Sequence, residues 1–181
     1  SGSQGVFHEA ALVSVPKSVE QPEYSFQVNA RGTFNVLDAA RKSGVARVVL
    51  ASSAAVYGDS TELPLVESAV PRPLSPYGLD KLSGEQMGRL YSSLYGQQIV
   101  ALRYFNVFGP RQDPHSPYSG VISIFADCLR SGRTPTIFGD GEQTRDFVYV
   151  GDVVDANLRA MFSDYRGFRT FNVASGRQTS L

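Results

Sequence analysis

Residues 45–53 read VARVVLASS, and this stretch decides the fold. Its first seven residues form an apolar, β-branched run, which is typical of a strand buried on both faces of a sheet. Long helices are predicted before and after it, over Pro22–Lys42 and Tyr77–Tyr95, and a glycine that favours a helix end follows each. Further apolar runs predict strands at Val6–Phe7 and over Gln98–Tyr104.

The order strand, helix, strand, helix, strand indicates right-handed parallel crossovers. The sequence therefore predicts an α/β fold with a doubly wound parallel sheet. Ligands of such sheets bind beyond the carboxyl ends of the strands. We expect the functional residues to gather at that edge.

The chain is predicted to have two parts, residues 4–109 with the sheet and residues 110–181 with a smaller lobe that would cover the site. We also expect residues 110–181 to contain elements that return to the sheet. In the lobe we expect an amphipathic helix over Val121–Arg130. A glycine-containing turn is predicted between the apolar segments Thr136–Phe138 and Asp146–Tyr149.

Composition excludes several classes of function. The chain has 181 residues, with 17 basic and 17 acidic side chains, so its formal net charge is zero. Nucleic-acid and membrane-surface binders need a basic excess, so we expect neither partner. The single cysteine, Cys128, fits a reducing compartment, and no apolar run approaches the roughly 18 residues of a membrane span. We therefore expect a cytoplasmic protein, without a signal peptide and without a metal site.

Tyr77 and Lys81 are four residues apart at the start of a predicted helix, so they share one face. An ammonium beside a phenol favours the phenolate, and we expect it to lower the pKa of Tyr77 from about 10 toward neutrality. Such a tyrosine can exchange a proton with a hydroxyl group. Ser52 and Ser53 follow the strand of residues 45–51, where Ser53 would hydrogen-bond the same substrate oxygen. Alternatively, the two serines only turn the chain out of the sheet, and the tyrosine and lysine form a surface pair.

Four segments carry a specific resemblance. They are SAAVYG at 53–58, SPYG at 75–78 with Lys81, RYFNVFGPR at 103–111, and GDGEQTRDF at 139–147. In this order and spacing they closely resemble UDP-glucose and UDP-N-acetylglucosamine 4-epimerases. These enzymes are extended short-chain dehydrogenases/reductases of the NAD-dependent epimerase/dehydratase family. The resemblance runs from Val6 to Leu181.

The resemblance implies a Rossmann-like fold, an NAD cofactor, and epimerisation of a UDP-sugar at C4 through a 4-keto intermediate. It implies Tyr77 as general acid/base, Lys81 as its electrostatic partner, and Ser53 as the residue that shares the proton of the sugar hydroxyl. The residues that it assigns to the cofactor are Ala10, Ala11, Leu12, Asn29, Ser52, Ser53, Tyr77, Lys81, Tyr104 and Phe105. Those that it assigns to the substrate are Ser14, Ser53, Tyr77, Asn106, Val121, Ile137 and Arg145, with Arg145 as a bidentate diphosphate clamp.

Ala54 and Ala55 favour epimerisation over dehydration. Sugar dehydratases of this family usually have acidic residues at these positions, and alanine neither donates nor accepts a proton. A uronate epimerase stays open as an alternative within the enzymes.

The printed sequence lacks the Gly-x-x-Gly-x-x-Gly loop with which the family cradles the dinucleotide pyrophosphate. The resemblance begins at the family's fourth strand, so we expect three strands and the end of the substrate lobe to be missing. One face of each central strand would then be exposed. We expect either a piece of a full epimerase or an inactive, non-catalytic remnant that oligomerises. In both cases the resemblance implies a homodimer through the helices at 22–42 and 77–95.

Overall fold

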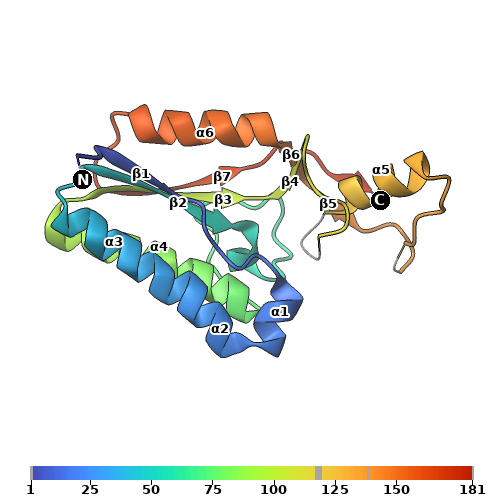
Figure 1. Ribbon diagram of the computed structural model, residues 1–181, viewed down its shortest axis with the longest axis horizontal. Helices are drawn as coiled ribbons and strands as arrows, with labels where there is room; N and C mark the ends of the chain where they lie inside the picture. Colours follow the sequence, from blue (N-terminus) through green and yellow to red (C-terminus); the bar gives the residue numbers. More distant parts are fainter. Residues whose placement is uncertain (1, 117–119, 138, 181) are drawn as a thin grey trace.

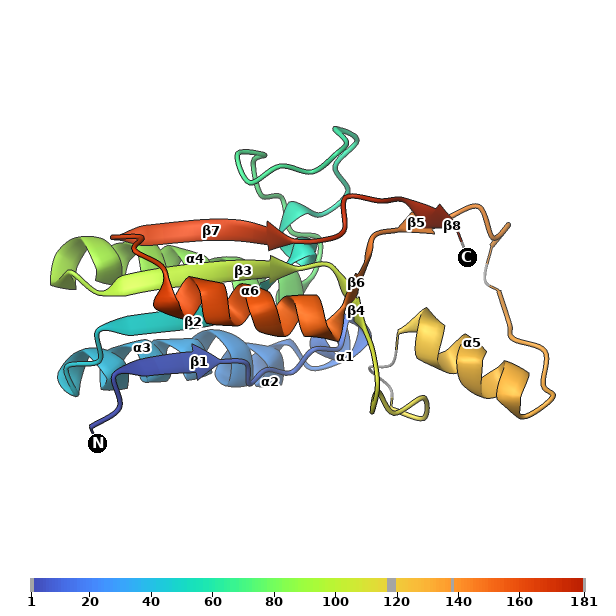
Figure 2. The same cartoon turned by 90° about the horizontal axis from the view of Figure 1, so that it is seen from above.

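The computed structural model describes residues 2–116, 120–137 and 139–180. Its centre is a four-stranded parallel sheet in the order β1-β2-β3-β7 (Figure 2). The strands are β1 (Gly5–His8), β2 (Arg47–Ser53), β3 (Gln98–Tyr104) and β7 (Phe168–Val173).

Helices cover both faces of this sheet, which confirms the predicted doubly wound arrangement (Figure 1). One face carries α1 (Val15–Glu20), α2 (Pro22–Phe26), η1 (Gln27–Arg31), α3 (Gly32–Lys42) and α4 (Pro76–Tyr95). The other face carries α6 (Val150–Phe162).

The helix predicted over Pro22–Lys42 is helical throughout, but five of its residues, Gln27–Arg31, form a π-helical turn. Such turns occur mostly as single insertions within α-helices and often lie at functional sites. The central strand begins at Arg47 and runs through Ser53, so the two serines lie within the strand and not after it. The elements expected to return to the sheet from residues 110–181 were predicted without bounds, so α6 and β7, which complete the fold, were not located by the sequence.

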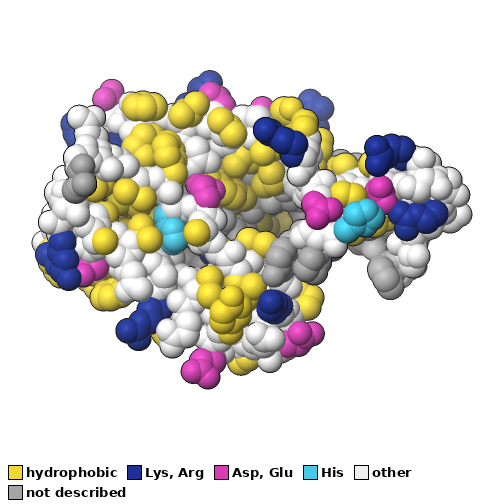
Figure 3. Space-filling view, viewed as in Figure 1, with side chains coloured by type: hydrophobic (Ala, Val, Ile, Leu, Met, Phe, Trp, Pro, Cys, Tyr) yellow, Lys and Arg dark blue, Asp and Glu magenta, His cyan; other side chains and the backbone are white. Residues whose placement is uncertain are grey.

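The core has two layers. Val48, Leu50, Ile99 and Ala101 face α3 and α4, and the alternate residues, such as Val49, Val100 and Leu102, face α6. All seven side chains are at most 4% exposed. The expected exposure of one face of the central strands is therefore wrong, because α6 covers that face. Exposed apolar side chains lie on several elements, and on α6 they are Val154, Leu158 and Phe162. Figure 3 shows apolar side chains on the surface of the α6 layer and on the helices of the opposite layer.

Smaller elements follow the carboxyl ends of the sheet. The 3-10 turn η2 (Ala54–Tyr57) comes directly after β2. Two short pairs lie beyond β3: β4 (Asn106–Phe108) with β6 (Phe147–Tyr149), and β5 (Thr144–Arg145) with β8 (Thr179–Ser180).

The helix α5 (Val121–Arg130) has the predicted bounds and projects away from the sheet (Figure 1). The segments on either side of the predicted glycine turn do not pair with each other. Thr136 and Ile137 are in no strand, and Phe138 lies outside the described residues. β6 pairs with β4 instead.

In the described parts of the chain, no helix has the length and apolar character needed to cross a membrane. The same residues contain no group of three or more His, Cys, Asp or Glu side chains that could hold a metal ion.

Candidate active site

A cavity of about 480 Å³ lies beyond the carboxyl ends of β2 and β3. Its walls come from β2, η2, α4, β4 and the lobe that contains α5, so segments far apart in the sequence meet there. The predicted site residues that line it are Ser53, Tyr77, Tyr104, Phe105, Asn106, Val121 and Arg145.

Ser53 and Tyr77 meet at one wall of the cavity. Ser53 is the last residue of β2 and caps η2, because its Oγ accepts a hydrogen bond from the Ala55 amide at 3.1 Å. Tyr77 lies in the first turn of α4 and lines the cavity beside Ser53. One bond fixes the start of this helix: the Tyr77 amide donates to Ser18 Oγ at 3.1 Å.

Gly78 allows α4 to approach η2 closely. A Cβ atom at Gly78 would lie 2.7 Å from the carbonyl oxygen of Ala55, a distance that real Cβ contacts essentially never show. Without a side chain at this position, the first turn of α4 packs directly on the backbone that follows Ser53. This contact sets the distance between Ser53 and Tyr77.

Burial raises the pKa of Tyr77 above its ordinary value, although the neighbouring Ser53 side chain acts in the opposite direction. The predicted shift toward neutrality is therefore wrong for the chain by itself. The Lys81 ammonium lies 5.9 Å from the Tyr77 ring centroid and donates to the Ala51 carbonyl at 2.7 Å. Desolvation of the buried phenol is the dominant cause of the shift.

Burial also lowers the pKa of Lys81 to about 8, while the nearby carboxylates of Glu9 and Asp80 favour its charged form. Lys81 is thus poised near neutral pH, where it can be protonated or neutral. An ammonium has three N–H donors. The bond to Ala51 uses one of them.

Asn29 supports the segment that follows β1. It lies in the π-helical turn η1, and its side chain makes two bonds to the backbone of Leu12: Oδ1 accepts from the Leu12 amide at 2.7 Å and Nδ2 donates to the carbonyl at 3.0 Å. Leu12 is buried, with Ala10 and Ala11 immediately before it. Asn29 thereby fixes the backbone of Leu12 in the segment that follows β1.

Eight predicted residues do not line the cavity: Ala10, Ala11, Leu12, Asn29 and Lys81, described above, and Ser52, Ser14 and Ile137. Ser52 points to the α4 face, where its buried hydroxyl donates to Glu85 at 2.6 Å, because neighbouring residues of a strand face opposite sides. The Ser14 side chain caps α1 by accepting from the Lys17 amide. Ile137 is 45% exposed and lies outside the cavity wall.

Sequence reasoning missed the groups that hold Tyr104. Its phenol donates to the Glu9 carboxylate, with both oxygens at 3.1 Å, and accepts from Asn157 Nδ2 at 2.7 Å. Burial raises the pKa of Glu9, and it also raises the pKa of Tyr104. Glu9 follows a strand end, which was a usable signal, whereas Asn157 lies on α6, which the sequence did not locate.

Residues 1–174 match the NAD dependent epimerase/dehydratase family. The chain belongs to this family. It is 48% identical to a putative UDP-glucose 4-epimerase of Methanocaldococcus jannaschii, in an alignment that covers 97% of the chain and 57% of the relative. The chain thus spans little more than half the length of this relative.

Solved structures of epimerases agree with the fold. The UDP-N-acetylglucosamine 4-epimerase of Methanobrevibacter ruminantium, in complex with UDP-N-acetylmuramic acid, superposes with a TM-score of 0.94 at 44% identity. The match covers 98% of the chain and 56% of that structure. The Thermus thermophilus UDP-glucose 4-epimerase in complex with NAD gives a TM-score of 0.89 at 40% identity, over 98% of the chain and 58% of that structure.

Residues at the cavity of this family member, together with Lys81 beside Tyr77, fit the nicotinamide riboside half of NAD. Lys81 is a buried ammonium with donors beyond the one that Ala51 uses, and such donors suit the paired hydroxyls of a ribose. Tyr77 adds a phenol beside it. The apolar rings of Tyr104 and Phe105 supply a surface for a flat, uncharged or weakly hydrated ring.

Proposed function

We propose that this chain catalyses the NAD-dependent epimerisation of a UDP-sugar at C4 through a 4-keto intermediate. The observation that carries the proposal is that Ser53 and Tyr77 line the same cavity of about 480 Å³, with the Lys81 ammonium 5.9 Å from the centroid of the Tyr77 ring. A cavity of this size suits a small organic ligand.

Tyr77 acts as the general base and then as the general acid. As phenolate it removes the proton of the sugar 4-hydroxyl, while Ser53 hydrogen-bonds the same oxygen and so fixes its position. When bound, NAD supplies the acceptor, and then the donor, of the hydride at C4. Because burial raises the pKa of Tyr77, the phenolate needs positive charge nearby, and Lys81 is the cation that the chain provides.

Arg145 holds the diphosphate of the substrate. Its exposed guanidinium lines the same cavity as Tyr77, and one of its NH groups donates to the Thr144 carbonyl at 2.8 Å. The remaining donors suit bidentate binding of phosphate oxygens. A 4-keto sugar anchored there by its diphosphate can rotate without leaving the cavity. Hydride can then return to the opposite face of C4.

The walls of the cavity favour epimerisation over dehydration. Ala54 and Ala55 line it, and none of its lining residues within the described ranges is acidic. A dehydratase must move a second proton during elimination, and these side chains offer no carboxyl group for that step. This absence of acids among the described wall residues supports inversion at C4 alone.

A homodimer is part of the proposal. Phe34 on α3 and Leu90, Leu94 and Tyr95 on α4 are each more than 40% exposed, so these two helices present apolar side chains for a second copy of the chain. A cytoplasmic location is proposed from the single cysteine.

The test is an assay of the purified chain with NAD⁺ and UDP-glucose, and in parallel with UDP-N-acetylglucosamine, in which proton NMR detects inversion at C4. Calorimetric titration of NAD⁺ accompanies it. Appearance of the C4 epimer supports the proposal. Binding of NAD⁺ or UDP-sugar without any inversion contradicts it and favours the non-catalytic alternative.

A further inference from the structure

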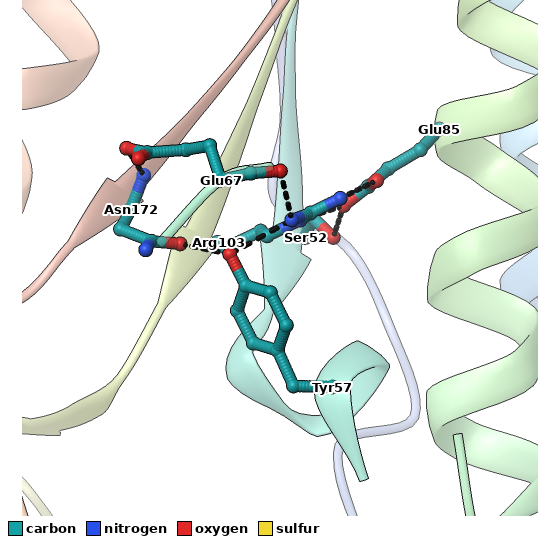
Figure 4. Close-up of polar contacts among 6 residues, drawn as sticks. All are labelled: Ser52, Tyr57, Glu67, Glu85, Arg103 and Asn172. Carbon is teal, nitrogen blue, oxygen red and sulfur yellow. Dashed lines mark hydrogen bonds and ion pairs between the residues drawn. The ribbon is translucent and has the colours of Figure 1, made fainter. Parts of the chain in front are cut away.

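Directly behind the Ser53–Tyr104 row, polar side chains from three strands, a helix and a turn form one connected group (Figure 4). We propose that this group, here called the polar network, is a positioning device that holds Ser53 and Tyr104 at the cavity wall. Its members are Ser52, Tyr57, Glu85, Arg103 and Asn172. The inference rests on the proposed function for its kinetic test only.

Three members form a single row across the sheet. Ser52 on β2 is in register with Arg103 on β3, and Arg103 is in register with Asn172 on β7. The next row pairs Ser53 with Tyr104, and both of these residues line the cavity. Because side chains alternate along a strand, the network lies on the α4 face, one residue before the site.

Glu85 ties this row to α4. It follows Tyr77 by about two helical turns, so both lie on the helix face that meets the sheet. Its carboxylate accepts from Ser52 Oγ at 2.6 Å, from Arg103 Nε at 2.9 Å and from an Arg103 terminal NH at 2.7 Å. The helix that presents Tyr77 is thereby bonded to the strand residue beside Ser53.

Tyr57 ties the row to η2. Its hydroxyl accepts from Arg103 at 2.8 Å and donates to Asn172 Oδ1 at 2.6 Å, and its ring lies 4.7 Å from the guanidinium carbon. The turn that ends at Tyr57 begins immediately after Ser53, and Ala54 within it forms part of the cavity wall. The network therefore holds the backbone on both sides of Ser53.

A stabilising role alone explains this arrangement poorly. The Arg103 and Glu85 side chains are only 5% and 4% exposed, and the cost of desolvating such a pair offsets most of its Coulomb attraction. What the pair does supply is geometry, because the guanidinium is a planar fork whose donors reach Glu85 and Tyr57 in fixed directions.

Removing single hydroxyl groups tests the inference without a large change in packing. Ser52→Ala removes one hydrogen bond of the network, and Tyr57→Phe removes two. Ser163→Ala is the matched control, because Ser163 also bonds a buried arginine, Arg47, but at the opposite end of the sheet. All three variants are compared in kcat, KM and melting temperature.

If the network positions the site, Ser52→Ala and Tyr57→Phe lower kcat by about tenfold or more, with KM within about twofold of the parent value. Ser163→Ala leaves kcat unchanged even if its melting temperature falls as far. A loss of kcat that merely follows the loss of melting temperature in all three variants overturns the inference.

A second readout works without turnover. The Ala55 amide donates to Ser53 Oγ, and its hydrogen exchange reports how firmly that side chain is held. We expect exchange at least about tenfold faster in Tyr57→Phe and unchanged in Ser163→Ala. An inactive parent chain contradicts the proposed function, whereas an unchanged exchange rate at Ala55 contradicts the positioning role, so the two failures are distinguishable.

Discussion

Two buried arginines lie at opposite ends of the same sheet and have different surroundings. Arg47, at the amino end of β2, donates to the carbonyl oxygens of Ala160 and Tyr165 around the end of α6. Arg103, near the carboxyl end of β3, pairs with the carboxylate of Glu85. The two side chains are similarly buried, with exposures of 8% and 4% for the whole residues.

The difference indicates that the two ends of the sheet have different roles. At Arg47, the partial negative charge of a helix C-terminus compensates the guanidinium, and its bonds fasten α6 to the sheet. At Arg103, burial alone would lower the pKa, but hydrogen bonds to Glu85 and Tyr57 raise it, so the cation is firmly held. The amino end fastens the layers together, and the carboxyl end fixes the geometry of the site.

The largest effect on kcat is expected from removing the Tyr77 hydroxyl at the carboxyl end of the sheet. Tyr77→Phe removes the proposed general acid/base and should lower kcat by about 10²–10⁴-fold. The control is Tyr91→Phe on the same helix. The Tyr91 ring packs against Phe34 and Tyr95 and does not line the cavity. Steady-state kinetics of both variants check this. Equal losses of kcat in Tyr77→Phe and Tyr91→Phe would contradict the assignment of the site to the carboxyl end of the sheet.

Replacing the two arginines sharpens the comparison directly. Arg103→Met leaves the Glu85 carboxylate buried without its ion-pair partner, and we expect a loss of about 3–5 kcal/mol in the free energy of unfolding. Arg47→Met leaves only neutral carbonyl groups without a donor, which costs about 1–3 kcal/mol. Urea denaturation measures both values. The account is contradicted if Arg47→Met proves the more damaging substitution.

Lys81, near the carboxyl end of the sheet, should make the stability of the chain depend on pH. Its pKa is about 8 in the folded chain against 10.5 when unperturbed, so the unfolded chain binds more protons between these values. The free energy of unfolding should therefore rise with pH from about 8 to 10.5. Lys81→Met should lack this contribution, and its melting temperature relative to the parent should fall across that window.

The exposed Lys42 provides the control for the loss of one positive charge. Lys42→Met should keep the pH dependence of the parent chain in thermal melts from about pH 7.5 to 10.5. A parallel course for the parent and Lys81→Met would show that Lys81 is not the group responsible.

The smallest effect is expected at the amino end. Gly96 caps α4 with φ of 71°, and a Cβ atom there would meet nothing within 4 Å. Gly96→Ala should lower the free energy of unfolding by about 1 kcal/mol. The methyl group meets no neighbour, so the cost comes only from the left-handed backbone conformation, which is unfavourable for alanine. Thermal unfolding measures this cost, and kcat should stay at the parent value. A reduced kcat would mean that the two ends are coupled.

Local patterns in the sequence predicted much of the fold. The β-branched run before Ser52 and the apolar run of Gln98–Tyr104 indicated the two central strands, with only a two-residue shift in the first. The helix α6 and strand β7 were not located, and α6 is what covers the second face of the sheet. Their segments carry no motif, and they become visible only through long-range packing.

The site was predicted where its chemistry is local in sequence. Tyr77 and Lys81 follow from helical spacing, but the direction of the Tyr77 pKa shift depends on burial, which no spacing reveals. Ser52 does not line the cavity, because the strand continues through it and its hydroxyl donates to Glu85. Arg103 lies beside Ser52 on the neighbouring strand. The two residues are far apart in the sequence, and local sequence patterns do not predict such contacts.

The central claim is that Tyr77 and Ser53 serve an inversion at C4 in which the same hydride leaves and returns. The most direct measurement is incubation of the chain with NAD⁺ and UDP-glucose carrying deuterium at C4, followed by NMR of the product. The account predicts UDP-galactose with deuterium retained at C4. Product with solvent hydrogen at C4, or no inversion at all, would contradict it.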